Sequence, residues 1–250
     1  MKLKRIHFKR YFNVLILVMI YMSMLLLKER TANVMQLTKA STDSSNRDKI
    51  TVVLDAGHGG RDPGKVGVNN ALEKDINLGI ALKLKDILEQ NDISVIMTRA
   101  DDNGLYSESD SNKKNADLRK RVEIINTSGA VLAISIHQNS FTQEEEKGAQ
   151  VFYYSASAEG KKFAEIIQGQ LKKSLQDGNR RVAKSNDSYY MLKKTELPIV
   201  IVECGYMSNY DESALLIDKN YQEKMAWAIH LGLVTYLKQY TSKTTSTEIK

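Results

Sequence analysis

Short apolar runs alternate along this chain with longer segments in which apolar residues recur every three or four positions. A β-branched run such as ITVVLDA is typical of a strand buried on both faces, and a stripe at helical spacing is typical of an amphipathic helix. This alternation predicts a single α/β domain, with a mostly parallel sheet flanked by helices on both faces. The expected strands are 50–56, 94–99, 131–137, 149–154 and 199–203, and the expected helices are 73–91, 113–126, 158–176 and 220–240.

The alternating pattern fills residues 50–240, which contain no internal repeat and no second apolar pattern. A chain of 250 residues has room for one such domain. We expect residues 28–49, rich in Ser, Thr and Lys, to be a polar linker, and residues 241–250 to be a disordered tail.

The N-terminus has the composition of a membrane-targeting segment. Residues 1–10 are basic, and residues 11–27 form a run of 17 residues without a charge. As a helix this run would be ~25 Å long, near the lower limit for a membrane span. The preceding positive charges predict that residues 1–10 stay in the cytoplasm and that the domain lies outside. No A-x-A cleavage site follows, so an uncleaved signal-anchor is favoured over a cleaved signal peptide or a buried core helix.

The net charge of +6 does not indicate a nucleic-acid partner. The first thirty residues carry all of this excess, and acidic and basic side chains balance in the remainder of the chain. Without a basic domain, we expect no nucleic-acid binding.

Candidate chemistry gathers where the predicted strands end. His58 follows the first strand in DAGHGG, His137 ends the third in SIHQNS, and Glu203 ends the last in VECGYMSN. Glu73 opens the first helix in ALEKDIN, after a long glycine-rich loop. Because carboxyl ends of parallel strands meet at one edge of a sheet, these side chains can converge.

Two histidines and one carboxylate are a typical ligand set for a catalytic zinc ion, with one position open for water. His58, Glu73 and His137 fit the ligands of one Zn²⁺, and Glu203 fits the general base. Each residue alone has a simpler interpretation. Either histidine could be merely hydrogen-bonded, and Glu73 could be an acid favoured by the helix dipole.

Taken together, the four motifs resemble the zinc-dependent N-acetylmuramoyl-L-alanine amidases of the type-3 family over roughly residues 50–240. In that resemblance DAGHGG, LEKDIN and SIHQNS correspond to the metal-ligand motifs, and VECGYMSN to the catalytic-glutamate motif. ADLRKRVEIIN resembles the helix before the third motif, and Tyr206-Met207 stands where Phe-Leu is commoner. The resemblance implies a six-stranded sheet, one zinc ion, and cleavage between the lactyl group of muramic acid and L-alanine of the stem peptide.

The short N-terminal segment and the lack of wall-binding repeats resemble the spore-cortex, germination-specific branch of this family. That branch removes stem peptides so that muramic-δ-lactam forms. The resemblance therefore implies a role in sporulation, on the extracytoplasmic face of the membrane and in the intermembrane space of the forespore. Some relatives in it need an activating protein partner. Residues 101–115 are a polar insertion without a readable specificity. Arg180, Arg181, Tyr189 and Tyr190 could line a groove or belong to a solvated loop.

Three other hypotheses remain at this stage. A thiol amidase would use Cys204, but strand alternation turns this cysteine away from Glu203. A tethered wall-binding or scaffolding protein could use the same fold without catalysis. A zinc hydrolase of a different amide would use identical metal chemistry.

Overall fold

The computed structural model describes residues 49–247. Its six strands form one sheet in the order β2-β1-β3-β6-β4-β5. Strands β2, β1, β3 and β6 are parallel, whereas β4 runs antiparallel to β6 and β5 runs parallel to β4. The strands are β1 (Thr51–Ala56), β2 (Ser94–Met97), β3 (Leu132–Asn139), β4 (Gln150–Tyr153), β5 (Lys184–Ser185) and β6 (Ile199–Tyr206).

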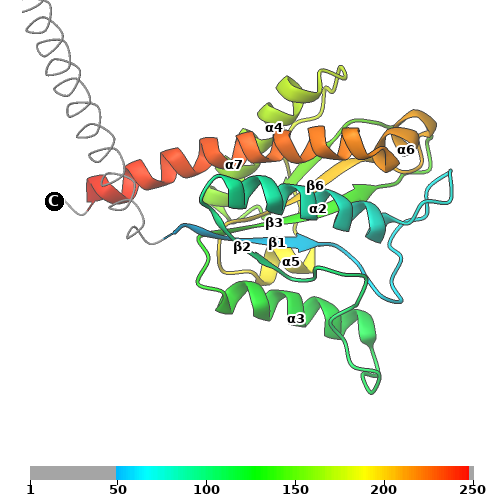
Figure 1. Ribbon diagram of the computed structural model, residues 1–250, viewed down its shortest axis with the longest axis horizontal. Coiled ribbons are helices and arrows are strands. Elements are labelled where there is room, and N and C mark those ends of the chain that lie inside the picture. Colours follow the sequence, from blue (N-terminus) through cyan, green and yellow to red (C-terminus); the bar gives the residue numbers. More distant parts are fainter. Residues whose placement is uncertain (1–48, 248–250) are drawn as a thin grey trace, which may run out of the picture. The chain divides into compact units, whose positions relative to one another are not determined.

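Helices cover both faces of the sheet, as the alternation of strands and helices predicts. Figure 1 shows α2, α4 and α7 on one side of the sheet and α3 and α5 on the other. The helices are α2 (Glu73–Gln90), α3 (Lys113–Thr127), α4 (Ala158–Leu175), α5 (Tyr190–Lys194), α6 (Tyr210–Ile217) and α7 (Lys219–Thr247). Among the described residues, these elements form one compact unit.

Strand alternation divides the apolar core into two clusters. In β1, Val52 and Leu54 belong to the larger cluster, which also contains buried residues of α2, α4 and α7. Val53 belongs to the smaller cluster, with buried residues of α3 and α5. A central parallel strand is therefore apolar at nearly every position, because both of its faces are covered.

Some boundaries differ from the sequence-based expectation. Strand β3 continues to Asn139 and β6 to Tyr206. His137 and Glu203 therefore lie within these strands, two and three residues before their ends. Helix α7 continues to Thr247, past residue 240, where we expected a disordered tail to begin. Extending an existing helix costs far less than starting one, and residues 241–247 contain no Gly or Pro to stop it.

The described residues contain no helix that is both long enough and apolar enough to cross a membrane. The predicted anchor at residues 11–27 and the linker that follows it lie outside the described residues, up to residue 48.

Candidate metal centre

His58 sits in a tight turn directly after β1. Its backbone has a φ of 62°, in the left-handed region that few residues other than glycine adopt. Gly57 precedes it, and a Cβ at Gly57 would lie 2.2 Å from Cε1 of His137. Only a glycine lets the β1 turn pass this close to the imidazole on the neighbouring strand.

Glu73 is the first residue of α2 and is 2% exposed. Its Oε2 accepts a hydrogen bond from the backbone N–H of Lys65 at 2.7 Å, and its Oε1 accepts one from the N–H of Gln138 at 3.1 Å. Burial favours a higher pKa for Glu73, but hydrogen bonds from His137 and His58 outweigh it and lower the pKa. Glu73 is thus held as a carboxylate.

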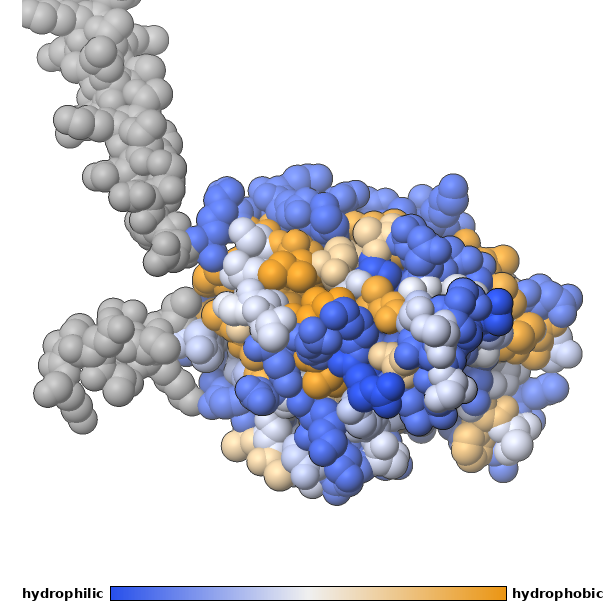
Figure 2. Space-filling model, turned by 90° about the horizontal axis from the view of Figure 1, so that it is seen from below, coloured by the Kyte–Doolittle hydropathy of each residue, from blue (hydrophilic) through white to orange (hydrophobic). Residues whose placement is uncertain are grey.

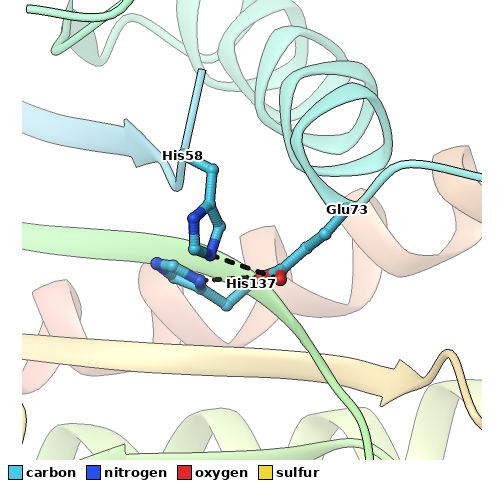
Figure 3. A group of neighbouring side chains, drawn as sticks. All are labelled: His58, Glu73 and His137. Atoms are coloured by element: carbon cyan, nitrogen blue, oxygen red, sulfur yellow. Dashed lines mark hydrogen bonds and ion pairs between the residues drawn. The ribbon is translucent and has the colours of Figure 1, made fainter. Parts of the chain in front are cut away.

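The structure brings His58, Glu73 and His137 together. Both imidazoles point toward the carboxylate (Figure 3), with Nε2 of His58 3.2 Å from Oε2 and Nδ1 of His137 2.9 Å from Oε1. The two rings lie edge to face, with centroids 5.0 Å apart. One potential ligand atom from each residue lies within 4.8 Å of the other two. These three residues therefore offer converging donors from β1, α2 and β3.

Asp62 is a site residue that the motif reasoning missed. Nδ1 of His58 donates to Oδ2 of Asp62 at 2.9 Å, and the N–H of Gly64 donates to Oδ1 at 3.1 Å. Burial lowers the pKa of His58, but the bonds to Asp62 and Glu73 outweigh this and raise it to about 9. A carboxylate on one nitrogen fixes the tautomer that presents the other nitrogen to a metal. The only sequence signal was an acid four residues after His58.

Two buried arginines hold the His58 turn. Arg121 of α3 donates to the carbonyls of Ala56 at 2.7 Å and His58 at 2.6 Å. Arg99, just after β2, donates to the carbonyls of Ala56, Gly57 and Lys74 at 2.8, 3.0 and 2.8 Å. The carbonyl of Lys74 follows Glu73 directly, so Arg99 connects the turn that carries His58 to the helix start that carries Glu73.

A buried ion pair anchors Arg121 in turn. Its guanidinium donates to Oδ1 of Asp55 at 2.6 Å and to Asp117. Burial favours a higher pKa for Asp55, but Arg121 and hydrogen bonds from Ser135 and Thr98 lower it to about 2. The sequence motif containing Arg121 therefore supports the turn from behind and supplies no ligand.

Glu203 lies beside the three converging residues and is only 6% exposed. It is in register with His137 on the adjacent parallel strand, so the two side chains share one face of the sheet. Oε1 of Glu203 accepts a hydrogen bond from the Tyr189 hydroxyl at 3.1 Å, whereas buried Oε2 has no partner among the described residues. Burial raises the pKa of Glu203, and the Glu73 charge adds to this rise.

Of the other residues that the sequence analysis names, one lies at the site and the rest lie away from it. Of the four possible groove residues, Tyr189 contacts Glu203, whereas Arg180 and Arg181 line a different cavity and Tyr190 is exposed. Cys204 is fully buried in the larger core cluster, on the face opposite to Glu203, and burial raises the pKa of its thiol. This placement argues against a thiol nucleophile. His230 is buried in α7 against Trp227.

An α/β sheet that gathers two imidazoles and a buried carboxylate at its carboxyl edge is built like a metallohydrolase. Comparison with known sequences narrows this class. The chain belongs to the N-acetylmuramoyl-L-alanine amidase family, whose profile matches residues 52–235. It is therefore an enzyme of the peptidoglycan amidase type, as the four motifs predicted.

Individual relatives agree with the family assignment. The chain is 40% identical over 191 residues to the germination-specific N-acetylmuramoyl-L-alanine amidase of Bacillus subtilis, covering 75% of this chain and 80% of that protein. It is similar to the CwlD amidase of Clostridioides difficile, solved in complex with the GerS lipoprotein, with 44% identity and a TM-score of 0.74 over 76% of this chain and 98% of that one. The catalytic domain of CwlV from Bacillus (Paenibacillus) polymyxa var. colistinus has 31% identity and a TM-score of 0.67, over 76% of this chain and 98% of that one.

Proposed function

We propose that the chain hydrolyses the amide between the lactyl group of N-acetylmuramic acid and L-alanine of the stem peptide, with one Zn²⁺ held by His58, Glu73 and His137. The observation that carries the proposal is the convergence of these three donors within 4.8 Å. Two nitrogen donors and one carboxylate oxygen match zinc better than a hard, all-oxygen site for Mg²⁺ or Ca²⁺.

When bound, Zn²⁺ supplies Lewis acidity that activates water and polarises the scissile carbonyl. The protein orients the ligands for it. Asp62 fixes the ring of His58, and the backbone N–H groups of Lys65 and Gln138 fix the carboxylate of Glu73. Outer partners of this kind typically contribute ~10–100-fold to metal affinity or activity.

Glu203 is the proposed general base and acid. It takes the proton of the attacking water and then gives it to the nitrogen of the departing L-alanine, which leaves as an amine. The Tyr189 hydroxyl occupies Oε1, so that Oε2, which lacks a partner among the described residues, is free for this transfer. A raised pKa suits the first half of the step, because the conjugate base of a weaker carboxylic acid takes the proton of water more readily.

The products test the reaction. Purified peptidoglycan treated with the chain should release stem peptides with a free L-alanine amine and leave glycan with free lactyl carboxyl groups, identified by mass spectrometry. Peptides that begin at another residue would indicate a different amide substrate. Binding to peptidoglycan without release of either product would instead support a wall-binding or scaffolding protein on an amidase fold.

The relatives support a more specific role in the spore. We propose that the chain removes stem peptides during cortex formation, so that muramic-δ-lactam forms, because a relative at 40% identity is named as germination-specific. This role requires the catalytic domain on the extracytoplasmic side, where residues 11–27 would tether it. Spores of a deletion strain should lack muramic-δ-lactam. Cortex with a normal lactam content would contradict the spore role and leave the amidase proposal standing.

A protein partner is the second specific proposal. The similar CwlD amidase was solved in complex with a lipoprotein, and we propose that a lipoprotein likewise assists this chain. The host's corresponding lipoprotein should raise the rate of peptide release and the zinc occupancy when added to the purified chain. Full zinc occupancy and an unchanged rate in its presence would contradict this proposal.

A further inference from the structure

The cavity at the candidate metal centre is bounded by a lysine that has no part in the chemistry described so far. Lys114, in the first turn of α3, lines the same cavity as His58 and His137. It also lines a second cavity of about 300 Å³, which shares Asp62 and Asp117 with the first. The two cavities therefore adjoin at these residues, and together, as the groove, they extend from the metal centre to the start of α3.

The polar insertion at residues 101–115 forms the outer wall of this groove. The backbone N–H of Arg61 donates to the Tyr106 hydroxyl at 2.8 Å, and the N–H of Leu105 donates to Asp117 at 2.7 Å. Glu108 pairs with Arg61 at 3.1 Å and with Lys113 at 3.5 Å. The insertion is thus fastened to both the loop after β1 and the start of α3, so its groove-facing wall is preformed.

Most of the charges along the groove are paired with one another. Three acids line it: Asp62 is bound to His58, and Asp55 and Asp117 are both bound to Arg121. Four basic side chains also line it. Arg121 pairs with two of these acids, Arg61 and Lys113 share Glu108, and the fourth is Lys114. Lys114 is exposed and lies close enough to Asp62 to help lower the pKa of that carboxyl, but its ammonium group makes no hydrogen bond or ion pair within residues 49–240. The face viewed from the α3 side has hydrophobic residues across its middle with hydrophilic residues around them (Figure 2).

The substrate supplies anions on only one side of the scissile bond. In an intact amide the lactyl carboxyl group is consumed, so the glycan side presents neutral hydroxyl and acetamide groups. The free carboxylates belong to the stem peptide. A Lys ammonium is a compact, strongly hydrated charge that attracts such an anion, and the amino end of α3 adds the positive end of a helix dipole.

We propose that this groove binds the peptide side of the substrate and that Lys114 determines specificity by pairing with a stem-peptide carboxylate. The inference rests on the proposed amidase function and extends it to substrate orientation. With the peptide along α3, the glycan strand lies on the other side of the metal centre. Lys114 acts on substrate binding, so its effect falls mainly on KM.

The experiment compares two substrates with the full zinc-loaded chain. One is a disaccharide–peptide with free stem carboxylates, and the other is the same compound with carboxamides in their place. The wild type should have kcat/KM about tenfold higher for the carboxylate form, and raising the salt concentration should shrink this ratio. In Lys114→Met the ratio should fall to about one through KM, and Lys114→Arg should retain most of it.

Lys120→Met is the matched control, because Lys120 is exposed on the same helix and pairs with Glu123 at 3.0 Å. Its ratio should equal that of the wild type. Equal losses on both substrates in Lys114→Met, or an unchanged ratio, would overturn the proposal. A wild type that cleaves neither compound would count against the amidase function itself. Calorimetric binding of the two compounds to Glu203→Gln would then still decide whether Lys114 discriminates between them.

Discussion

Gly57 and Glu203 illustrate how single side chains limit this site. At Gly57 the absence of a Cβ is what matters, because the space next to it is filled by the ring of His137. At Glu203 the carboxylate is what matters, because a charge that is 6% exposed on an apolar strand needs either a partner or a role. Its Oε1 has Tyr189 as a partner, and its Oε2 has none among the described residues.

Glu203→Gln separates catalysis from metal binding. Glutamine keeps the shape of the side chain but cannot accept a proton from water. We expect peptide release to slow by about 10²- to 10⁴-fold, the usual contribution of a general base. Zinc content, measured by atomic absorption, should stay at the wild-type level. A variant that turns over at the wild-type rate would show that another group moves the proton.

Tyr189→Phe tests whether the tyrosine tunes the base. Phenylalanine keeps the edge-to-face contact with Phe152, whose ring centroid lies 5.7 Å away, but removes the hydrogen bond to Glu203. That bond lowers the pKa of Glu203, so its loss should raise the pKa and reduce the fraction of active carboxylate at low pH. The acidic limb of the kcat/KM profile should therefore move to higher pH. A lower rate with an unmoved limb would indicate a packing role only.

Gly57→Ala should disturb the ligand His137 without removing any polar group. The added Cβ would lie 2.2 Å from its Cε1, so the ring has to move. Zinc affinity, measured by competition with a chelator, should fall by about 10- to 100-fold, as it does when the support of a ligand is lost. Gly169→Ala in α4 is the control, since nothing lies within 4 Å of its added Cβ. Equal affinities in the two variants would contradict this account of the turn.

At the scale of elements, long periodic segments were predictable and short ones were not. The helix over Glu73–Gln90 and the strand over Thr51–Ala56 each have a clear apolar period, and both were predicted. The two-residue β5 and the five-residue α5 are too short to show any period, so they were missed. Tyr189 lies between β5 and α5, and its hydroxyl reaches Glu203. Because neither element was predicted, the contact between Tyr189 and Glu203 could not be predicted.

The ion pair between Asp55 of β1 and Arg121 of α3 makes the free energy of unfolding depend on pH in acid. The pKa of Asp55 is about 2 in the folded chain, against ~3.9 for an unfolded aspartate. A depressed folded pKa contributes stability above pH ~4 and loses it as the pH falls toward ~2. The lost contribution is about 2 kcal/mol.

Denaturant unfolding between pH 5 and pH 2 measures this contribution. The wild type should lose more free energy of unfolding over this interval than Asp55→Asn, by about 2 kcal/mol. At pH 5 Asp55→Asn should be less stable outright, because it leaves the buried guanidinium of Arg121 with less charge compensation. Parallel pH dependences in the two proteins would show that Asp55 does not titrate as the ion pair requires.

At the scale of the whole molecule, the topology of the sheet brings the site residues together from distant parts of the sequence. His58, Glu73, His137 and Glu203 are far apart in sequence, and parallel strands bring their segments to one edge of the sheet. The sequence therefore indicated which residues can meet. It could not indicate Asp62 or the groove beside Lys114, because both depend on how the loops at residues 57–72 and 101–112 fold against each other.

The most direct test of the central claim measures zinc content together with peptide release in the purified chain. The account predicts one Zn²⁺ per chain, loss of peptide release when a chelator removes it, and recovery when zinc is returned. His58→Ala should lose both the metal and the activity. Peptide release that continues in a chain stripped of zinc would contradict the proposed role of His58, Glu73 and His137.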